Sequence, residues 1–400
     1  MDNELGGSNS AFQLPSTEIE LKRYFVDVGY LHEISDNWDI SFNYTFQKDS
    51  AIWQINEAVG NNKSDARSDF YETIIRGSLG ENLNLLFGGS YLEVESKFAF
   101  IHPKSGLPTL PLSSTSYKSL YTQADYMLSE NQKIIAGLQW NKPKNVDSDY
   151  SPRLGFIQGL GEQTWMKLLY SEAYRSPTFV ETSLDAPQLK GVPTLEPEKI
   201  QTFDLQLIKQ TPRSYLALAL YHSQLENQIV RIPGSPTTHA NEGYVTFKGI
   251  EFEARYEVSE DLNIMGNASY QKNKTNSGVE QSTFAPEAMI KLGAVYSGLK
   301  GVTISVFNSY ITESTDLNTT NIAPAINPKA DAYNLLTANM ILDTGKLWGL
   351  GKPNTSLLSI YVDNILDESI YAPDLNFANQ NNTIPHHWGF GAYVTYTYRF

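Results

Sequence analysis

The stretch that decides the fold is the C-terminal segment Trp388–Phe400, which reads WGFGAYVTYTYRF. Every second residue is apolar or aromatic, beginning with Trp388, and most of the residues between them are small or polar. This strict alternation predicts a β-strand with two chemically different faces. At roughly 3.3 Å per residue, a strand of this length crosses a hydrocarbon layer of about 30 Å. We therefore expect the closing strand of a membrane barrel, with the C-terminus in the periplasm.

The same alternation recurs along the chain and predicts about seventeen strands. Tight turns and longer connections alternate between these strands, as in transmembrane barrels, where short periplasmic turns alternate with long extracellular loops. The expected strands are 18–33, 38–47, 67–79, 82–97, 116–128, 132–140, 150–158, 164–174, 199–209, 214–224, 244–258, 262–273, 284–296, 302–311, 332–342, 355–363 and 388–399.

The predicted fold is therefore an all-β, antiparallel transmembrane barrel in the bacterial outer membrane. The barrel domain covers residues 18–400, and residues 1–17 are expected to be an extracellular loop remnant or a disordered N-terminus. A ring of about sixteen or more strands is too wide for side chains to fill, so its inside is wet and its outside is apolar. The alternative is a large soluble β-protein, whose apolar face would pack inward.

Composition narrows the class of protein. No apolar stretch is long enough for a transmembrane helix, while 24 Tyr and 18 Phe suit aromatic girdles at two membrane interfaces. The absence of cysteine excludes disulfides and thiolate chemistry. A net charge of -14 argues against a nucleic-acid partner.

The start of the chain is unusual for an outer-membrane protein. Met1–Pro15 has neither a basic region nor an apolar core, so it is no signal peptide. An odd strand number with a periplasmic C-terminus places Met1 outside the cell, whereas single-chain barrels have even strand numbers. The pattern predicts that the chain begins partway through a barrel. A miscount by one strand is the other explanation.

Several stretches resemble motifs of TonB-dependent receptors, in the order and spacing expected from about Tyr150 to Phe400. They are EAYRSPT at 172–178, LEPE at 195–198, FKGIEFE at 247–253, FAPE at 284–287, VDNILD at 362–367 and the terminal YRF at 398–400. The resemblance implies a 22-stranded barrel preceded by a plug domain and a segment that engages TonB. Neither precursor is visible in this sequence, so contact with TonB is expected only through an N-terminal region absent here.

The resemblance also implies function. We expect an outer-membrane receptor for TonB-dependent uptake of a scarce nutrient, a ferric siderophore by family frequency, with cobalamin, haem or an oligosaccharide as alternative ligands. The terminal aromatic Phe400 is expected to be part of the signal read by the barrel-assembly machinery. A passive porin-like or structural barrel is the alternative that the missing plug favours.

Ligand binding is expected where long outer loops converge over the barrel mouth. Arginines and aromatic residues suit an anionic metal chelate through charge-assisted contacts and stacking. The candidate ligand-binding residues are Arg175, Arg231, Tyr244, His386, His387 and Trp388. Trp388 also suits an interfacial aromatic girdle at the start of a strand.

No catalytic set, metal site or cofactor is expected. The carboxylate pairs Glu93/Glu95 and Glu251/Glu253 each share one face of a strand, and a barrel lumen lined with charge explains them better than a glycosidase-like pair. Adjacent histidines on a strand point apart, so His386 and His387 suit a loop or interface position, as does His239 in another loop.

Overall fold

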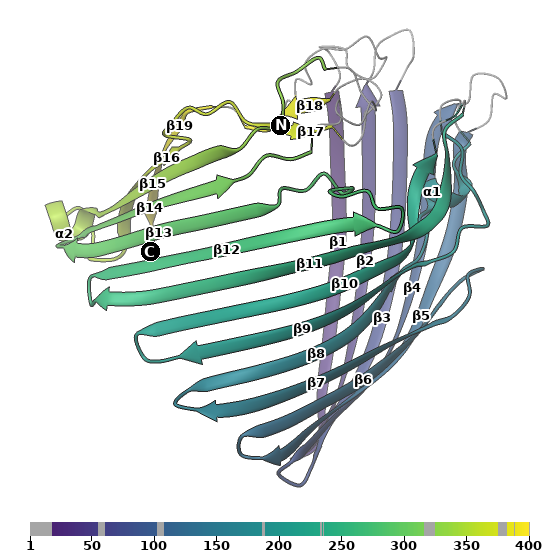
Figure 1. Cartoon of the computed structure of the whole chain (residues 1–400), viewed down its shortest axis with the longest axis horizontal. Coiled ribbons are helices and arrows are strands. Elements are labelled where there is room, and N and C mark those ends of the chain that lie inside the picture. The colour runs from purple at the N-terminus through teal and green to yellow at the C-terminus, as the bar shows by residue number, and fades with distance from the viewer. Residues whose placement is uncertain are drawn as a thin grey trace. The chain divides into compact units, whose positions relative to one another are not determined.

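The computed structural model of the chain describes residues 18–54, 61–101, 108–185, 189–232, 234, 236–315, 325–374, 382–387 and 389–399. The expected N-terminal segment 1–17, Trp388 and Phe400 lie outside these described residues. Most of the described chain is β-strand, and one antiparallel sheet contains 17 strands, as the sequence predicts. Figure 1 labels the elements.

The strands of the first half are long. They are β1 (Glu18–Ser35), β2 (Trp38–Gln54), β3 (Asn61–Leu79), β4 (Leu83–Ile101), β5 (Pro108–Ser129), β6 (Gln132–Pro143), β7 (Asp149–Gly161), β8 (Thr164–Arg175), β9 (Glu198–Gln210), β10 (Ser214–Ile232) and β11 (Thr238–Ser259).

The second half continues the sheet. Its strands are β12 (Leu262–Thr275), β13 (Ala288–Leu299), β14 (Val302–Ile311), β15 (Tyr333–Asp343), β16 (Ser356–Asp363) and β19 (Gly391–Tyr398), and a separate two-stranded sheet consists of β17 (Tyr371–Pro373) and β18 (Thr383–Pro385).

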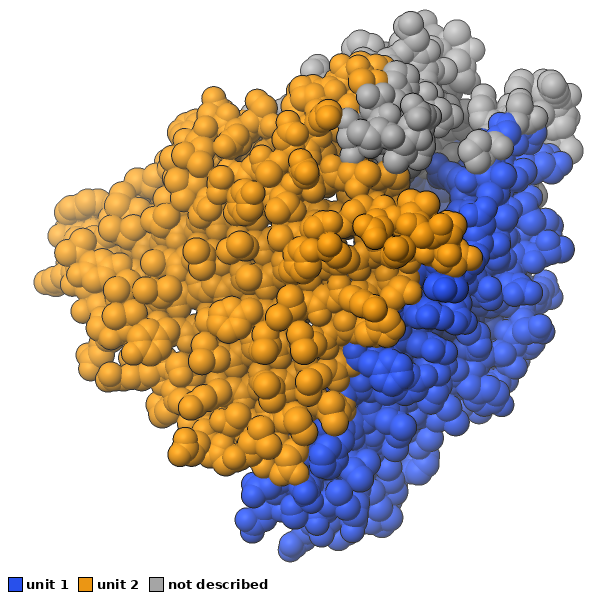
Figure 2. Space-filling model, in the orientation of Figure 1, with its two compact units in different colours: residues 1–157, 169–203, 223–245 blue, residues 158–168, 204–222, 246–400 orange. Residues whose placement is uncertain are grey.

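The chain forms two compact units, which Figure 2 colours separately. Unit 1 contains residues 1–157, 169–203 and 223–245, and unit 2 contains residues 158–168, 204–222 and 246–400. Strands β7 to β11 each contribute residues to both units.

In unit 1, strands β1 to β6 pair in sequence order with antiparallel registers. Directly opposite residues share a face, so the register sorts the side chains. One face carries a tyrosine row in which the ring centroids of Tyr44 and Tyr71 lie 4.9 Å apart and those of Tyr71 and Tyr91 6.4 Å apart. We call this the tyrosine face.

The opposite face of the same strands carries cross-strand polar pairs. The Asn43 amide donates to Asp27 at 3.2 Å, and the Tyr121 hydroxyl donates to Glu72 at 2.6 Å. Gly88 makes room for this second contact, because a Cβ built there would lie 2.2 Å from the Tyr121 ring. The predicted alternation of two chemically different faces is therefore present.

Unit 2 shows the same sorting in its C-terminal strands. Ile304, Met340, Ile360 and Val394 follow one another across β14, β15, β16 and β19. Val394 is 69% exposed, so the apolar row of the last strand is not tucked into a packed core. Its neighbour Thr395 lies on the other face, opposite Ser359.

Strands β2 to β5, β10 and β11 are longer than the alternation predicts at their loop ends, whereas β13 and β19 begin later than expected. The expected connection 48–66 is wrong, because β2 and β3 continue pairing until Gln54 lies opposite Asn61. The expected connections 98–115 and 225–243 are likewise shortened by β4, β5, β10 and β11. Antiparallel pairing uses backbone groups that polar residues also carry. The alternation therefore marks only the part of a strand that has one apolar face.

The hairpin β17–β18 and two five-residue helices were not predicted. Helix α1 (Phe179–Ser183) lies between β8 and β9, and α2 (Thr344–Trp348) lies between β15 and β16. Asp343 caps α2 through a hydrogen bond from the Lys346 amide, and Gly349 ends it at φ +69°. None of the helices in the described ranges is long and apolar enough to span a membrane.

The Gly88 contact predicts a selective loss of stability. We expect Gly88→Val to displace the Tyr121 ring and separate its hydroxyl from Glu72, lowering the free energy of unfolding by about 1–3 kcal/mol. The matched control is Gly29→Val on the same face, where a Cβ meets only Asn43 at 3.7 Å. Urea unfolding followed by tryptophan fluorescence measures both variants. Equal losses in the two would contradict the contact's role.

Candidate functional site

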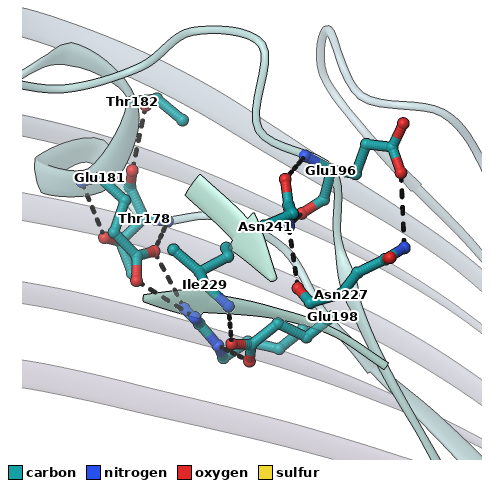
Figure 3. Close-up of polar contacts among 9 residues, drawn as sticks. Thr178, Glu181, Thr182, Glu196, Glu198, Asn227, Ile229 and Asn241 are labelled. Atoms are coloured by element: carbon teal, nitrogen blue, oxygen red, sulfur yellow. Dashed lines mark hydrogen bonds and ion pairs between the residues drawn. The ribbon is translucent and has the colours of Figure 1, made fainter. Parts of the chain in front are cut away.

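Arg175 is the last residue of β8, and its guanidinium lies between two carboxylates. Its Nε donates to Glu198 Oε2 at 2.5 Å, and its Nη1 and Nη2 donate to the two oxygens of Glu181 at 3.0 and 3.1 Å. Paired N–H donors facing a carboxylate give the strong bidentate geometry that arginine favours. We call Arg175, Glu181 and Glu198 the Arg175 cluster. Its polar contacts appear in Figure 3.

Helix α1 positions Glu181. Thr178 is its N-cap, and the Glu181 amide donates to the Thr178 hydroxyl at 3.3 Å while the Thr178 amide donates to Glu181 Oε2 at 2.7 Å (Figure 3). This reciprocal capping box satisfies amides that the first helical turn leaves open. The Glu181 carboxylate therefore joins the helix start to Arg175.

Glu198 connects the cluster to the next strands. It is the first residue of β9 and is only 8% exposed. While one of its oxygens accepts from Arg175, the other accepts from the Ile229 amide of β10 at 2.7 Å (Figure 3). A buried carboxylate needs such partners, because removing it from water without them is costly. Glu198 thus ties β8 to β10.

Asn241 of β11 closes the segment between α1 and β9. Its side-chain oxygen accepts from the Glu196 amide at 2.8 Å, and its Nδ2 donates to the carbonyls of Glu196 and Asn227 at 2.9 and 2.8 Å (Figure 3). Asn227 has φ +54°, a conformation that asparagine tolerates better than most residues. The loop ends of β8 to β11 are therefore held by a continuous polar network.

Electrostatics favour the charged form of Glu181. Burial by itself raises the pKa of this carboxyl, but hydrogen bonds from Arg175 and Thr178 and the charge of Arg175 outweigh it, so the pKa lies below the ordinary value of 4.5. The carboxylate and the guanidinium therefore remain an ion pair at neutral pH.

The other candidates of unit 1 lie on the neighbouring strands. Arg231 is an exposed residue near the end of β10, and Tyr244 of β11 is 44% exposed. His239 was expected in a loop, and this was wrong, because it lies in β11 and is 7% exposed. The difference follows from the unexpected extension of β11 toward its loop end.

The two adjacent histidines lie in unit 2 and have different surroundings. His386 is exposed, and its amide donates to the Ile370 carbonyl at 2.8 Å. His387 is half-buried, with Nε2 at 3.1 Å from Asp363 Oδ2. Asp363 ends β16 and belongs to the VDNILD motif, so this motif holds the loop that follows it. Among the described residues, no three histidine or acidic side chains converge as a metal site.

A second set of hydrogen bonds joins two loop segments of unit 2, one containing Asn382 and the other Asn327. We call it the Asn382 clasp. Asn382 is 1% exposed, and its oxygen accepts from the amides of Ile326 and Asn327 at 3.1 and 3.0 Å. Its Nδ2 donates to the Asn327 carbonyl at 2.9 Å, and the Asn327 amide group donates back to the Thr383 carbonyl at 2.7 Å. Asn382 thus holds the backbone, not the side chains, of the opposing segment.

Sequence reasoning placed Arg175 but missed its partners. Glu181 could have been found, because Thr178 and Glu181 have the spacing of a capping box. Nothing in the sequence pointed to Asn241, whose contacts reach 45 residues along the chain. The ligand-binding roles of the six candidates stay predictions.

Removing the charge of Glu198 should lower the protection of backbone amides in the segment between β8 and β9. We expect Glu198→Gln to accelerate hydrogen exchange at the Thr182 and Val192 amides by roughly 10- to 100-fold, because it weakens a charge-assisted hydrogen bond at a buried group. Glu196→Gln is the matched control, since its exposed carboxylate has only a 3.4 Å contact with Asn227. Similar acceleration in both variants would refute the assignment.

Low pH should also lower amide protection in this segment between β8 and β9. Because the folded-state pKa of Glu181 is depressed, its contribution to stability is fully present above about pH 4.5 and is lost as pH falls through the folded-state pKa. We expect protection factors at the Thr182 amide to be constant from neutral pH to about pH 5 and to fall in more acidic solution. Glu181→Gln should remove this pH dependence, and its persistence in that variant would contradict the assignment.

Comparisons with known proteins give a consistent family. The model of the family described as "TonB dependent receptor-like, beta-barrel" matches residues 2–365. A comparison with curated proteins gives no match.

Solved structures share the fold at low sequence identity. A mutant of the ferric enterobactin receptor PfeA from Pseudomonas aeruginosa is 15% identical with a TM-score of 0.77, over 96% of this chain and 62% of that one. The copper transporter OprC is 13% identical with a TM-score of 0.75, over 95% and 68%. The ferric-catecholate import receptor Fiu from E. coli K12 is 12% identical with a TM-score of 0.71, over 96% and 65%.

This chain therefore spans 62% of the length of the enterobactin receptor. The structural likeness establishes the fold, and the family match covers most of the sequence. The chain belongs to the TonB-dependent receptor-like β-barrel family.

Proposed function

We propose that the chain forms the barrel wall of an outer-membrane receptor for TonB-dependent uptake of a scarce nutrient, with a ferric siderophore as the ligand. Family membership across residues 2–365 supports the receptor class. Structures named as ferric enterobactin, ferric-catecholate and siderophore receptors share the fold, which supports the ligand class. In this proposal the protein is a transporter and not an enzyme.

The observation that carries the proposal is that hydrogen bonds fix the loop backbones near the ends of the strands. The Arg175 cluster, Asn241 and Asn382 hold loop backbones near the ends of strands through hydrogen bonds, several of which are half-buried. A passive pore needs no fixed loops, whereas a binding site needs side chains held in place before the ligand arrives. The loop segments around Glu181, Glu196 and Asn327 have the second property.

Within the ligand site we assign direct contact to Arg231, which is exposed near the loop end of β10, and to Tyr244, an exposed residue of the neighbouring strand β11. A guanidinium attracts an anionic chelate, and a phenol ring stacks on a catechol. Arg175 holds the loop, because its guanidinium already faces two carboxylates. His386 and Trp388 are further candidates, and His387 is engaged with Asp363.

The proposal fixes an orientation in the membrane. The long loops lie outside the cell, the short turns and the C-terminus lie in the periplasm, and Phe400 is read by the barrel-assembly machinery. In this proposal energy reaches the barrel through TonB, as the family name implies.

Titration of the purified chain with a ferric catecholate, followed by quenching of tryptophan fluorescence in detergent, tests the ligand class. We expect saturable binding, with Arg231→Gln and Tyr244→Ala each weakening it by about tenfold or more because each removes one direct contact. Lys300→Gln is the control for loss of one positive charge, since Lys300 is exposed in the short turn between β13 and β14.

Two results would overturn the proposal. One is equal weakening by Lys300→Gln, which indicates unspecific attraction of the anion. The other is an open conductance of the complete gene product in planar bilayers that no ferric chelate alters, which is the behaviour of a passive porin.

A further inference from the structure

A groove of about 460 Å³ lies on the tyrosine face of unit 1, outside the site described above. It crosses β3 to β6, and its wall is mainly apolar and aromatic. The side chains of the tyrosine face that line it are Tyr71, Thr73, Tyr91, Lys118, Leu120 and Trp140.

The groove is open because a glycine lies at its centre. Gly89 lies between Thr73 and Leu120 in the register, so β4 has no side chain at this level of the tyrosine face. Leu120 is 61% exposed beside the gap, and Trp140 lies opposite it on β6. A slot with apolar and aromatic walls on an exposed sheet face suits a hydrocarbon chain.

Two lysines stand at one end of this groove. Lys118 of β5 lies directly opposite Lys142 of β6, one row beyond the Leu120–Trp140 pair and about 7 Å along the strands. Both are exposed, and within the described residues neither forms an ion pair. The Lys142 ammonium donates to the Val146 carbonyl at 2.9 Å. Like charges directly opposite each other destabilise a sheet unless an anion lies between them.

We propose that the groove and the lysine pair bind a phosphate-bearing membrane lipid, with an acyl chain along Gly89 and the phosphate between Lys118 and Lys142. The inference rests on the proposed function for one premise, that the tyrosine face meets the membrane. The tyrosine row beside the lysines marks an interfacial level, where a lipid headgroup meets its acyl chain. The apolar groove thus lies next to the two lysines, just as the acyl chain of such a lipid lies next to its phosphate.

The test is lipid binding to the whole chain in detergent, measured by native mass spectrometry with dipalmitoylphosphatidylglycerol and dipalmitoylphosphatidylcholine. We expect tighter binding of the phosphatidylglycerol. In Lys118→Gln/Lys142→Gln its affinity should fall roughly 30-fold, the loss expected for two lysine–anionic lipid contacts. The zwitterionic lipid should be little affected.

The matched control is Lys63→Gln/Lys97→Gln. These lysines lie on the same face of β3 and β4, at least about 20 Å from the pair along the strands, and their loss changes the net charge equally. A second variant, Gly89→Val, keeps both lysines and occupies the groove. A Cβ there lies 3.1 Å from the end of the Leu120 side chain, which can move. We expect it to weaken dipalmitoylphosphatidylglycerol and to spare the water-soluble headgroup glycerophosphoglycerol.

Equal loss in the control pair, or full binding in Lys118→Gln/Lys142→Gln, would overturn the inference. Displacement of the lipid by glycerophosphoglycerol at similar concentration would also overturn it, since the anion alone would then suffice. A second copy of the chain bound in the groove would appear as a dimer in the same spectra, and its presence in place of lipid would also overturn the inference. If the chain binds the ferric catecholate but not the lipid, only this inference is overturned. If it binds the lipid but not the ferric catecholate, only the proposed function is overturned.

Discussion

The register between antiparallel strands is the constraint on which the rest of the structure depends. Side chains alternate with a period of two, so a slip of one residue would exchange the faces of a whole strand. In unit 1 it would carry Asn43 into the row now held by Tyr44. The polar pairs on one face and the groove on the other both follow from the same backbone ladder.

The sequence was sufficient for the strands because this ladder leaves a simple signature. The number of strands in the main sheet, most of their central residues and the sorting of their faces follow from alternation and turn composition. The terminal segment is an example, since Val394 and Thr395 lie on opposite faces as their chemistry requires. Motif resemblance then identified the family that the sequence comparison establishes.

The candidate site was harder to predict because its contacts join residues distant in sequence. Arg175 was recognised as a cation suited to a ligand, but its geometry depends on Glu181 and Glu198. Strand ends were also misplaced, since polar residues pair in a ladder without alternating. His239 was consequently expected in a loop, although an extended β11 buries it.

The clasp at Asn382 has a consequence for the history of the protein. Because it grips main-chain amides and a carbonyl, its hold does not depend on which side chain stands at Ile326. Substitutions at this exposed position can change the chemistry of the surface while the segment stays anchored. The exposed face of this segment can therefore diversify in evolution without loss of the hydrogen bonds that hold its backbone.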